Sequence, residues 1–344
     1  MISRPEEVKK TPRTRGGGVF MNLSEIRLHT NDFSWDNKMS ELSNSEKTLV
    51  EEYIKQCEDS LESMISNKGD IFLSSHTYKG FSWDSHYQVN KHHFPLKNYI
   101  LLAFPMLRTI CSRPAADKCY VIECGCGTGS TLLPIIRQFK NNIHFIAFDI
   151  SESAISALLE HPIAKECGER NQLTAFQFDI SGSHKFTLDE PERSRRRIEV
   201  LRLKNSIMEK VPACSSVDAV LLVFVLSSLP SIQSMLYALK EINSILKDDG
   251  ILLFRDYAVP DNSLLRFTGR NNPKFNAYSF CKGDGTLQMF YELNFAKKLF
   301  ALAGFVEIEG HELEYHCNRI VNRKNHKRMD KIFLNGTFRP ARNS

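Results

Sequence analysis

The sequence predicts an α/β protein whose mostly parallel, seven-stranded sheet is covered by helices on both faces. Two observations predict this class. Short apolar runs typical of buried strands alternate with amphipathic stretches of helical period, and a glycine-rich turn joins the first such run to a helix. Alternation of this kind favours parallel pairing, because each crossover helix returns the chain to the same edge of the sheet. A chain of 344 residues is long enough for one such domain with an extension.

The predicted elements follow one another along the chain. Five strands should pair in parallel, with helices between most of them. After a further helix that begins near residue 293, two more strands should finish the sheet as a hairpin. The strands are expected at about 118–123, 144–149, 173–179, 218–224, 251–257, 305–311 and 329–338, and the helices at about 131–139, 153–160 and 232–246.

The chain around this sheet divides into parts of different composition. Pro5, Pro12 and three consecutive glycines give the first residues the character of a flexible arm. Helical patterns follow, and a long, highly charged stretch without strand-like alternation later interrupts the sheet as an insertion at its edge, partly helical or disordered. The predicted division is an arm at 1–44, a helical extension at 45–115 with helices at about 45–65 and 97–110, the main domain at 116–344, and the insertion at 181–212.

Composition argues against several classes of protein. The apolar share of 42% and the charged share of 25% are ordinary for a globular chain. No apolar run is long enough to cross a bilayer, and the polar N-terminus lacks the apolar segment of a secretory signal. The nine cysteines lack regular spacing, so we expect reduced thiols. No CxxC pair occurs and the histidines are scattered, so no metal site is predicted. Because no long apolar run occurs, membrane contact is not predicted either.

A glycine-rich turn follows the first predicted strand. Gly125, Gly127 and Gly129 let the backbone approach a ligand where Cβ atoms would collide, and the next helix offers free N–H groups at its start. A dinucleotide fingerprint would need a further glycine at position 130, which is Ser130. GxGxG preceded by an acidic residue, here Glu123, is instead typical of enzymes that use S-adenosylmethionine.

Two acidic residues at strand ends support the same cofactor. Asp149 ends the second strand, where a carboxylate can accept both ribose hydroxyls. Asp179 ends the third strand and is placed to accept the adenine amino group, with Ile180 packing on the ring. The alternative is a set of ordinary strand-to-loop residues. With the glycine turn, these acids predict a Rossmann-like class I methyltransferase that binds S-adenosylmethionine.

The methyl acceptor should lie beyond the carboxyl ends of the fourth and fifth strands. No Asn-Pro or Asp-Pro motif follows the fourth strand, and the fifth ends in Arg255, Asp256 and Tyr257. These three residues either form a satisfied ion pair at a strand end or line the opening of a substrate site. In the second case they would bind the edge of a base, stack on the base and contact a phosphate. No cysteine nucleophile motif is evident, so a substrate atom that attacks with its own lone pair is favoured.

Positive charge gathers in two segments, although the net formal charge is only +5. Such clusters can hold a polyanion through phosphate contacts and counterion release. Solvated loops are the alternative for either cluster alone. The first cluster contains Arg193, Arg195, Arg196, Arg197, Arg202 and Lys204, and the second contains Arg319, Arg323, Lys324, Lys327, Arg328 and Lys331.

Several segments in series resemble the methyltransferase-like family that makes 3-methylcytidine in tRNA anticodon loops. The resemblance runs from about residue 83 to the C-terminus. The glycine turn alone is generic, but Trp-Asp-x-x-Tyr, Phe-Arg-Asp-Tyr and Asp-Gly-Thr in this order are specific. The matching segments are Trp83-Asp-Ser-His-Tyr87, Phe104-Pro-Met-Leu107, the glycine turn, Phe148-Asp-Ile-Ser151, Leu222-Val-Phe-Val-Leu-Ser227, Phe254-Arg-Asp-Tyr257, Leu265-Arg-Phe267, Gly283-Asp-Gly-Thr286 and Ile320-Val-Asn322.

This resemblance implies a tRNA (cytidine-N3) methyltransferase that acts at position 32 of the anticodon loop. N3 of cytosine carries its own lone pair, so no base is needed to deprotonate it, but the nucleotide must be unpaired or flipped from its stack. The product is cationic, and a carboxylate beside it would stabilise the developing charge. Asp256 is the candidate for this catalytic role.

The resemblance also implies roles for single residues. The helical extension serves as a lid over RNA and cofactor, with Trp83 and Tyr87 above the cofactor; the alternative is that both are core aromatics. The family's Lys-Asp-Arg-His-Trp run is altered here, and Lys97 keeps a positive charge where arginine is usual. The implied cofactor residues are Trp83, Tyr87, Glu123, Gly125, Gly127, Gly129, Asp149, Asp179, Ile180 and Val223, and the implied RNA residues are Lys97, Arg255, Tyr257, Arg266, Arg319 and Arg323.

Two other functions stay open on the sequence. The chain could methylate a protein or small molecule on the same scaffold, or it could be a non-catalytic RNA-binding subunit that has kept the fold. Relatives in the family often need a helper protein such as a seryl-tRNA synthetase, so tRNA and such a synthetase are the expected partners. Glu6 and Glu7 disfavour a mitochondrial presequence, and we expect the protein in the cytoplasm, with the nucleus as the alternative.

Overall fold

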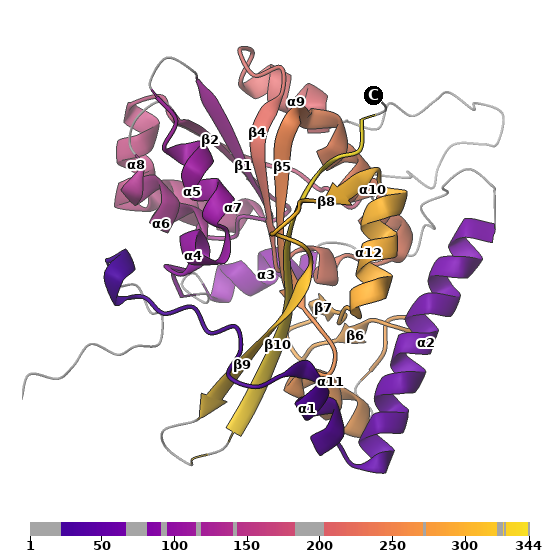
Figure 1. The fold of residues 1–344 in the computed structure, drawn as a ribbon. Coiled ribbons are helices and arrows are strands. Elements are labelled where there is room, and N and C mark those ends of the chain that lie inside the picture. The colour runs from indigo at the N-terminus through magenta and orange to yellow at the C-terminus, as the bar shows by residue number, and fades with distance from the viewer. Residues whose placement is uncertain are drawn as a thin grey trace, which may run out of the picture.

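A central sheet of eight strands organises the computed structural model, which describes residues 22–66, 81–90, 95–114, 118–139, 143–182, 203–270, 273–321, 326 and 328–342 (Figure 1). The strand order is β3-β2-β1-β4-β5-β10-β8, and β9 pairs with β10 beside this path. The strands are β1 (Cys119–Cys124), β2 (Ile143–Asp149), β3 (Leu173–Gln177), β4 (Val217–Val223), β5 (Leu246–Tyr257), β8 (Phe305–Glu307), β9 (Glu314–Val321) and β10 (Arg328–Pro340).

The first five strands are parallel and the last three are antiparallel to their neighbours. The α/β prediction is therefore confirmed. The helices are α1 (Trp35–Glu41), α2 (Asn44–Ser66), α3 (Phe81–Val89), α4 (Ile100–Ala103), α5 (Pro105–Cys111), α6 (Leu132–Gln138), α7 (Glu152–Glu160), α8 (Pro162–Glu169), α9 (Leu203–Lys210), α10 (Ile232–Ile245), α11 (Asn262–Gly269) and α12 (Leu293–Leu302), with short 3-10 turns η1 (Leu23–Glu25) and η2 (Leu226–Ser228) and a small hairpin of β6 (Phe280–Cys281) and β7 (Leu287–Gln288).

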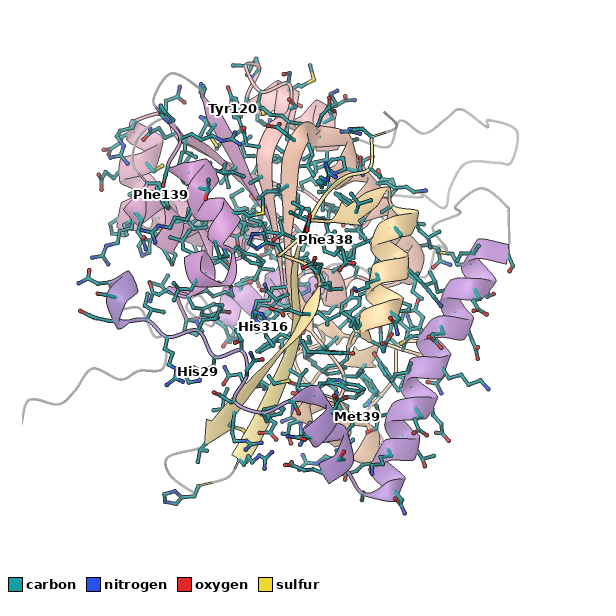
Figure 2. All side chains as sticks on the ribbon, viewed as in Figure 1. His29, Met39, Tyr120, Phe139, His316 and Phe338 are labelled. Carbon is teal, nitrogen blue, oxygen red and sulfur yellow. The ribbon has the colours of Figure 1, made fainter. Side chains whose placement is uncertain are left out.

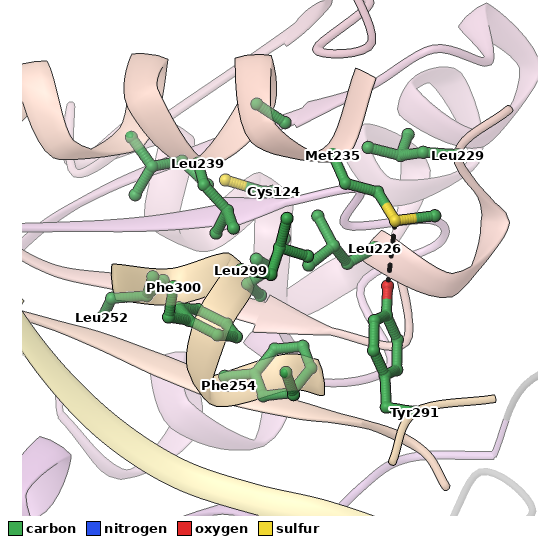
Figure 3. Packing of buried hydrophobic residues seen from close by; sticks show 14 of the residues in the cluster. Cys124, Leu226, Leu229, Met235, Leu239, Leu252, Phe254, Tyr291, Leu299 and Phe300 are labelled. Atoms are coloured by element: carbon green, nitrogen blue, oxygen red, sulfur yellow. Dashed lines mark hydrogen bonds between the residues drawn. The ribbon is translucent and has the colours of Figure 1, made fainter. Parts of the chain in front are cut away.

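Each face of the sheet carries its own apolar core. Successive β1 side chains point to opposite faces, so Ile122 joins one core and Val121 the other. Helices α4 to α8 cover one face, and α10, α12 and α2 lie on the opposite side (Figure 1). Figure 3 shows the core on the side of α10 and α12, where Leu299 and Phe300 of α12 pack with Phe254 of β5. Both faces are thus buried, as a parallel sheet requires.

The strand β9 is an addition that the sequence pattern did not predict. Its run Glu-Tyr-His-Cys-Asn-Arg-Ile-Val mixes polar and apolar residues without a clean period of two. It nevertheless pairs with β10 from Val321↔Arg328 to Glu314↔Asn335, while the other end of β10 pairs with β8. The thirteen-residue β10 therefore serves two partners in place of the simple hairpin expected.

Part of the predicted flexible arm is packed against the domain. Asn31 forms a bridge with Cys317 of β9, and the Asp32 N–H donates to the Cys317 carbonyl at 3.0 Å. Trp35 Nε1 donates to the Val259 carbonyl at 2.8 Å, and its ring stacks on Tyr315 with centroids 5.2 Å apart. The Trp35 ring and the strand β9 therefore hold residues 31–35 against the domain. Residues 1–21 lie outside the described part of the chain.

The predicted insertion at 181–212 also needs correction at its end. Residues 203–210 form α9, whose Leu203 and Ile207 are buried in the core. The Leu203 N–H donates to Glu241 of α10 at 2.7 Å. This helix is the crossover into β4 and not an appendage at the sheet's edge. The residues from 183 to 202 are outside the described ranges.

No helix within the described ranges is both long and apolar enough to span a bilayer.

Candidate active site

A cavity of about 620 Å³, here called the main cavity, opens where the strand order reverses between β1 and β4. In an open α/β sheet, ligands bind at this switch point beyond the carboxyl ends of the strands. The sequence-predicted residues that line it are Trp83, Tyr87, Lys97, Glu123, Gly125, Gly127, Asp149, Asp179, Ile180, Val223 and Tyr257. Residues from seven separate regions of the chain therefore meet at one site.

The glycine turn depends on the absence of side chains at all three glycines, and Gly125 and Gly127 border the cavity. Gly125 has a φ of +58° and Gly127 a φ of +51°, both in the left-handed region. A Cβ on Gly125 would lie 2.5 Å from Val225 Cγ2, and one on Gly127 would overlap the Tyr87 hydroxyl. The turn is therefore sealed by the loop after β4 on one side and by α3 on the other.

The carboxylate of Asp149 is buried and fixed by the backbone. Its Oδ2 accepts the Gly127 N–H at 2.8 Å, and its Oδ1 accepts the Ser151 N–H at 2.9 Å. Burial raises the pKa of Asp149 to about 6, although these N–H donors favour the ionised form. With the Ile150 N–H, three backbone donors meet about four lone-pair sites, so the carboxylate keeps acceptor capacity for a ligand and links the glycine turn to the cavity.

Glu123 and Lys97 form an oppositely charged pair in the wall of the cavity. Glu123 is 2% exposed, and its Oε2 has no hydrogen-bond partner among the described residues. Lys97 Nζ donates to Ser130 Oγ. Burial raises the pKa of Glu123 and lowers that of Lys97, while their mutual attraction opposes both shifts. A buried carboxylate oxygen without a donor is suited to a cationic group of a ligand.

The residues after β3 complete the side of the cavity next to β2. β3 ends at Gln177, two residues before Asp179, so the expected strand was slightly too long. Asp179 is half-buried, and its Oδ1 accepts the Ser181 N–H at 2.8 Å. Ile180 is 5% exposed and also lines the cavity.

Helix α3 places Trp83 and Tyr87 at the cavity. Their rings stack with centroids 6.0 Å apart. Asp84 docks the helix on the start of α7, because its Oδ1 accepts Ser151 Oγ–H at 2.7 Å and the Ser153 N–H at 3.0 Å. Tyr87 is 5% exposed, so it is a core residue and a lining residue at once.

Two sequence candidates at the end of β5 lie away from the cavity. Arg255 is 2% exposed, donates to His316 Nδ1 at 2.8 Å and to Asn335 Oδ1 at 3.0 Å, and is not available to RNA. Asp256 is 0% exposed and accepts the backbone N–H groups of Ser227 and Tyr257 at 2.9 and 2.8 Å. Neither side chain lines the main cavity, which argues against the roles the sequence suggested for them. A structural role at the strand end fits both better, although no described carboxylate pairs with Arg255 and its buried Nε has no hydrogen-bond partner among the described residues.

The other predicted RNA residues are spread over the molecule. Lys97 is half-buried and lines the cavity. Arg266 is exposed on α11, with its guanidinium 5.2 Å from the Phe267 ring centroid. Arg319 on β9 is held by Asp330, with Nε and Oδ1 3.1 Å apart. Arg323 falls outside the described residues. The structure does not bring Lys97, Arg266 and Arg319 together.

Some residues of the cavity were not predicted. Tyr99, Phe224 and Val225 line it, and the N-terminal segment adds Arg27 and His29. Figure 2 shows His29 on the irregular segment between η1 and α1. Residue patterns contained little sign of this segment, because the strand that holds it, β9, was itself not predicted. Phe224 stands in the segment Leu222–Ser227 that carries the family resemblance, which was the available signal.

Within the described ranges, no three His, Cys, Asp or Glu side chains are grouped as metal ligands. The cavity combines the glycine turn and a wall of aromatic and apolar side chains with the charged residues Glu25, Arg27, Lys97, Glu123, Asp149 and Asp179.

Comparisons with known proteins agree with this geometry. A family model described as "Methyltransferase domain" matches residues 98–309. The tRNA N(3)-cytidine methyltransferase METTL6 of Rattus norvegicus is 29% identical over 75% of this chain and 78% of the relative. The tRNA N(3)-methylcytidine methyltransferase trm140 of Schizosaccharomyces pombe is 30% identical over 74% of this chain and 73% of its own length.

A solved structure supports the fold alone. A SAM-dependent methyltransferase from Anabaena variabilis superimposes with a TM-score of 0.50 at 11% identity, over 76% of this chain and 94% of the other. With the family match and the relatives, this similarity assigns the architecture. The chain belongs to the methyltransferase-domain family and, within it, to the family of the tRNA N(3)-methylcytidine methyltransferases.

Proposed function

We propose that this protein methylates N3 of a cytidine in tRNA, at position 32 of the anticodon loop, with S-adenosylmethionine as the methyl donor. The observation that carries the proposal is the single cavity in which Glu123, Asp149 and Asp179 line up around the glycine turn in a chain of this family. The position within the tRNA rests on the family resemblance.

The cavity residues match the parts of the proposed cofactor. The free Oε2 of Glu123 would accept the ammonium of the methionine end, and Asp149 would accept the ribose hydroxyls. Asp179 would accept the adenine amino group, while Ile180 packs on the ring. The remaining cofactor contacts in the proposal are Trp83, Tyr87, Gly125, Gly127, Gly129 and Val223.

The cofactor, when bound, supplies a methyl group activated by a sulfonium. The protein's part is to align the acceptor nitrogen with that carbon and to exclude water, since no proton must be removed from cytosine N3. Tyr257 and Lys97 line the same cavity, and the proposal puts the target nucleotide beside them. Contacts of Arg266, Arg319 and Arg323 with the flanking RNA remain predictions.

Mass spectrometry of tRNA nucleosides from cells with and without the gene tests this function. We expect 3-methylcytidine to fall when the gene is deleted and to return with the wild-type gene but not with Asp149→Ala. Unchanged 3-methylcytidine would overturn the proposal. Methylation of a ribonuclease-treated extract by the purified enzyme would point to a protein or small-molecule substrate, and lack of S-adenosylmethionine binding by calorimetry would point to a non-catalytic subunit.

We also propose a helper and a compartment for the enzyme. Expected partners are tRNA and an aminoacyl-tRNA synthetase such as seryl-tRNA synthetase, and the expected location is the cytoplasm, with the nucleus as the alternative. Addition of the purified synthetase should raise the methylation rate of serine tRNA but not that of a threonine tRNA. Equal rates with and without the synthetase would exclude it as a helper, and imaging of the tagged protein decides the compartment.

A further inference from the structure

The end of the main cavity next to β4 and β5 is walled by aromatic side chains. Phe224 follows β4 directly and Tyr257 ends β5, and both line the cavity. Their ring centroids are 4.9 Å apart at an interplanar angle of 41°. Asp256, which the sequence favoured as the group that meets positive charge, is turned away with both oxygens bound to backbone N–H groups.

Phe224 holds an unusual backbone conformation. Its φ is +61°, in the left-handed region that side chains other than glycine rarely adopt. Its N–H donates to the Arg255 carbonyl at 2.8 Å, which continues the pairing of Val223 with Arg255. Such strained residues persist where the surrounding structure fixes them, and they gather at functional sites.

The ring of Phe224 is supported on one side and faces a positive group. Phe333 of β10 meets it edge-on with centroids 5.4 Å apart, at 69°. Lys97 Nζ lies over the ring, 5.8 Å from its centroid. The negative face of an aromatic ring attracts cations, so the ring face that holds the ammonium would also attract a base that gains positive charge, once the lysine side chain has moved aside.

Methylation of cytosine N3 creates such a group. The N3 lone pair forms the new bond to the methyl carbon, the carbon–sulfur bond breaks with its electron pair left on sulfur, and no proton moves. The positive charge therefore passes from the sulfonium to the base. An interaction that is stronger with the charged base than with the neutral one lowers the barrier.

We propose that the Phe224 ring, backed by Tyr257, receives the target base and stabilises the positive charge that methylation places on it. The proposal rests on the proposed function. Tyr257 stays a neutral phenol, because burial raises its pKa. The π faces of Phe224 and Tyr257 thus stabilise the positive charge, a role that the sequence suggested for the carboxylate of Asp256.

A binding experiment tests the charge preference without turnover. Two anticodon stem-loop RNAs, identical except for cytidine or 3-methylcytidine at position 32, are titrated into enzyme loaded with S-adenosylhomocysteine. We expect wild type to bind the methylated RNA roughly threefold to thirtyfold more tightly than the unmodified one. Phe224→Leu should reduce this preference to within about twofold, and Phe224→Trp should keep it. Phe139→Leu, a partly buried residue that does not line the cavity, is the matched control.

A second experiment keeps the shape of the ring and changes only its charge distribution. Phenylalanine with one, two or three fluorine atoms is placed at position 224, which weakens the negative π face step by step. We expect the logarithm of the single-turnover methylation rate to fall with each fluorine, while the calorimetric Kd for the cofactor stays constant. A merely structural role of Phe224 would leave the fluorinated enzymes at the wild-type rate.

The outcomes separate this inference from the proposed function. The inference alone would be overturned if wild-type enzyme forms 3-methylcytidine but the ring of Phe224 has no effect. In that case the fluorinated enzymes are as fast as wild type, and Phe224→Leu keeps the wild-type preference for methylated RNA. Wild-type enzyme that forms no 3-methylcytidine in any tRNA would overturn the proposed function and this inference with it.

Discussion

At the scale of single residues, the orphaned carboxylate oxygen of Glu123 gives the sharpest test of cofactor binding. Glu123→Gln keeps the shape but removes the charge that would meet the cofactor's ammonium. Hydrogen bonds to charged groups contribute about 1.5–3 kcal/mol, so the Kd for S-adenosylmethionine should rise roughly tenfold to hundredfold in calorimetry. The control is Glu241→Gln, a buried glutamate on α10 that lies outside the cavity. Equal affinities of Glu123→Gln and wild type would remove Glu123 from the site.

Asp149 predicts how cofactor binding depends on pH. Burial raises its pKa to about 6, so the carboxyl takes up a proton as the pH falls through 6. The protonated group loses an acceptor for a ribose hydroxyl, so Asp149 should contribute nothing to the pH dependence of the Kd above about pH 7 and a rise toward tenfold per pH unit below 6. Calorimetry from pH 5 to 8 measures this step.

Asp149→Asn isolates the contribution of this carboxyl to the pH profile. The variant should bind weakly at every pH and should lack the step near pH 6. Circular dichroism at each pH checks that both proteins stay folded. A wild-type Kd that does not change between pH 5 and 8 would contradict the assignment of Asp149 to the ribose.

At the scale of elements, the sequence predicted what depends on local pattern. The five parallel strands were foreseen because each is a short apolar run, and the outcome differs by a few residues at the ends. The expected helix at 97–110 is broken at Phe104, whose φ of −132° and ψ of 79° are not helical. Pro105 is the cause, since proline disfavours the α conformation in the residue before it.

What the sequence did not predict depends on contacts between distant segments. β9 becomes a strand because β10 offers a partner, and residues 30–32 become ordered because β9 then offers an edge. The same holds for the site. The alternation of β5 did not reveal that Arg255 and Asp256 turn away from the cavity, because their partners Asn335 and Ser227 come from other elements.

The N-terminal segment gives a prediction at this scale. Asp32 Oδ2 accepts the Arg319 N–H at 2.9 Å, and its Oδ1 lies 3.0 Å from His29 Nδ1. Asp32→Ala should loosen the segment from β9, and loss of about 1 kcal/mol would raise amide exchange at Arg319 roughly fivefold. Because Arg27 and His29 line the cavity, the KM for tRNA should rise as well.

Hydrogen exchange read by mass spectrometry, together with steady-state methylation, measures both effects of Asp32→Ala. Asp36→Ala is the control, since Asp36 is an exposed acidic residue on the neighbouring α1. Exchange at Arg319 that is the same in wild type and Asp32→Ala would show that the carboxylate does not hold the segment.

At the scale of the whole molecule, a buried polar cluster ties the parallel sheet to the β9–β10 hairpin and the helical extension. Arg255 of β5 donates to His316 of β9 and to Asn335 of β10. Asn335 Nδ2 donates in turn to the Ala103 carbonyl of α4 at 3.1 Å. Arginine has only donors, so His316 must present a lone pair at Nδ1 and carry its proton on Nε2, which faces Glu314 at 3.0 Å.

This arrangement requires neutral His316 and makes global stability depend on pH. Burial, with the Arg255 charge beside it, lowers the pKa of His316 from 6.5 to about 4. As the pH falls below 6.5, the unfolded chain takes up a proton at this residue while the folded protein does not, so stability is lost between pH 6.5 and 4. The loss should be about 2 kcal/mol between pH 7 and pH 5.

Urea unfolding at pH 7 and pH 5 measures the loss of stability over this interval in wild type and in His316→Gln. Glutamine offers an acceptor and a donor without titrating, so the variant should lose less stability over the interval by about the same 2 kcal/mol. Other groups that titrate there contribute equally to both proteins, and the difference isolates His316. Parallel losses in the two proteins would mean that the histidine is already charged in the folded state, and that Arg255 is held by some other acceptor.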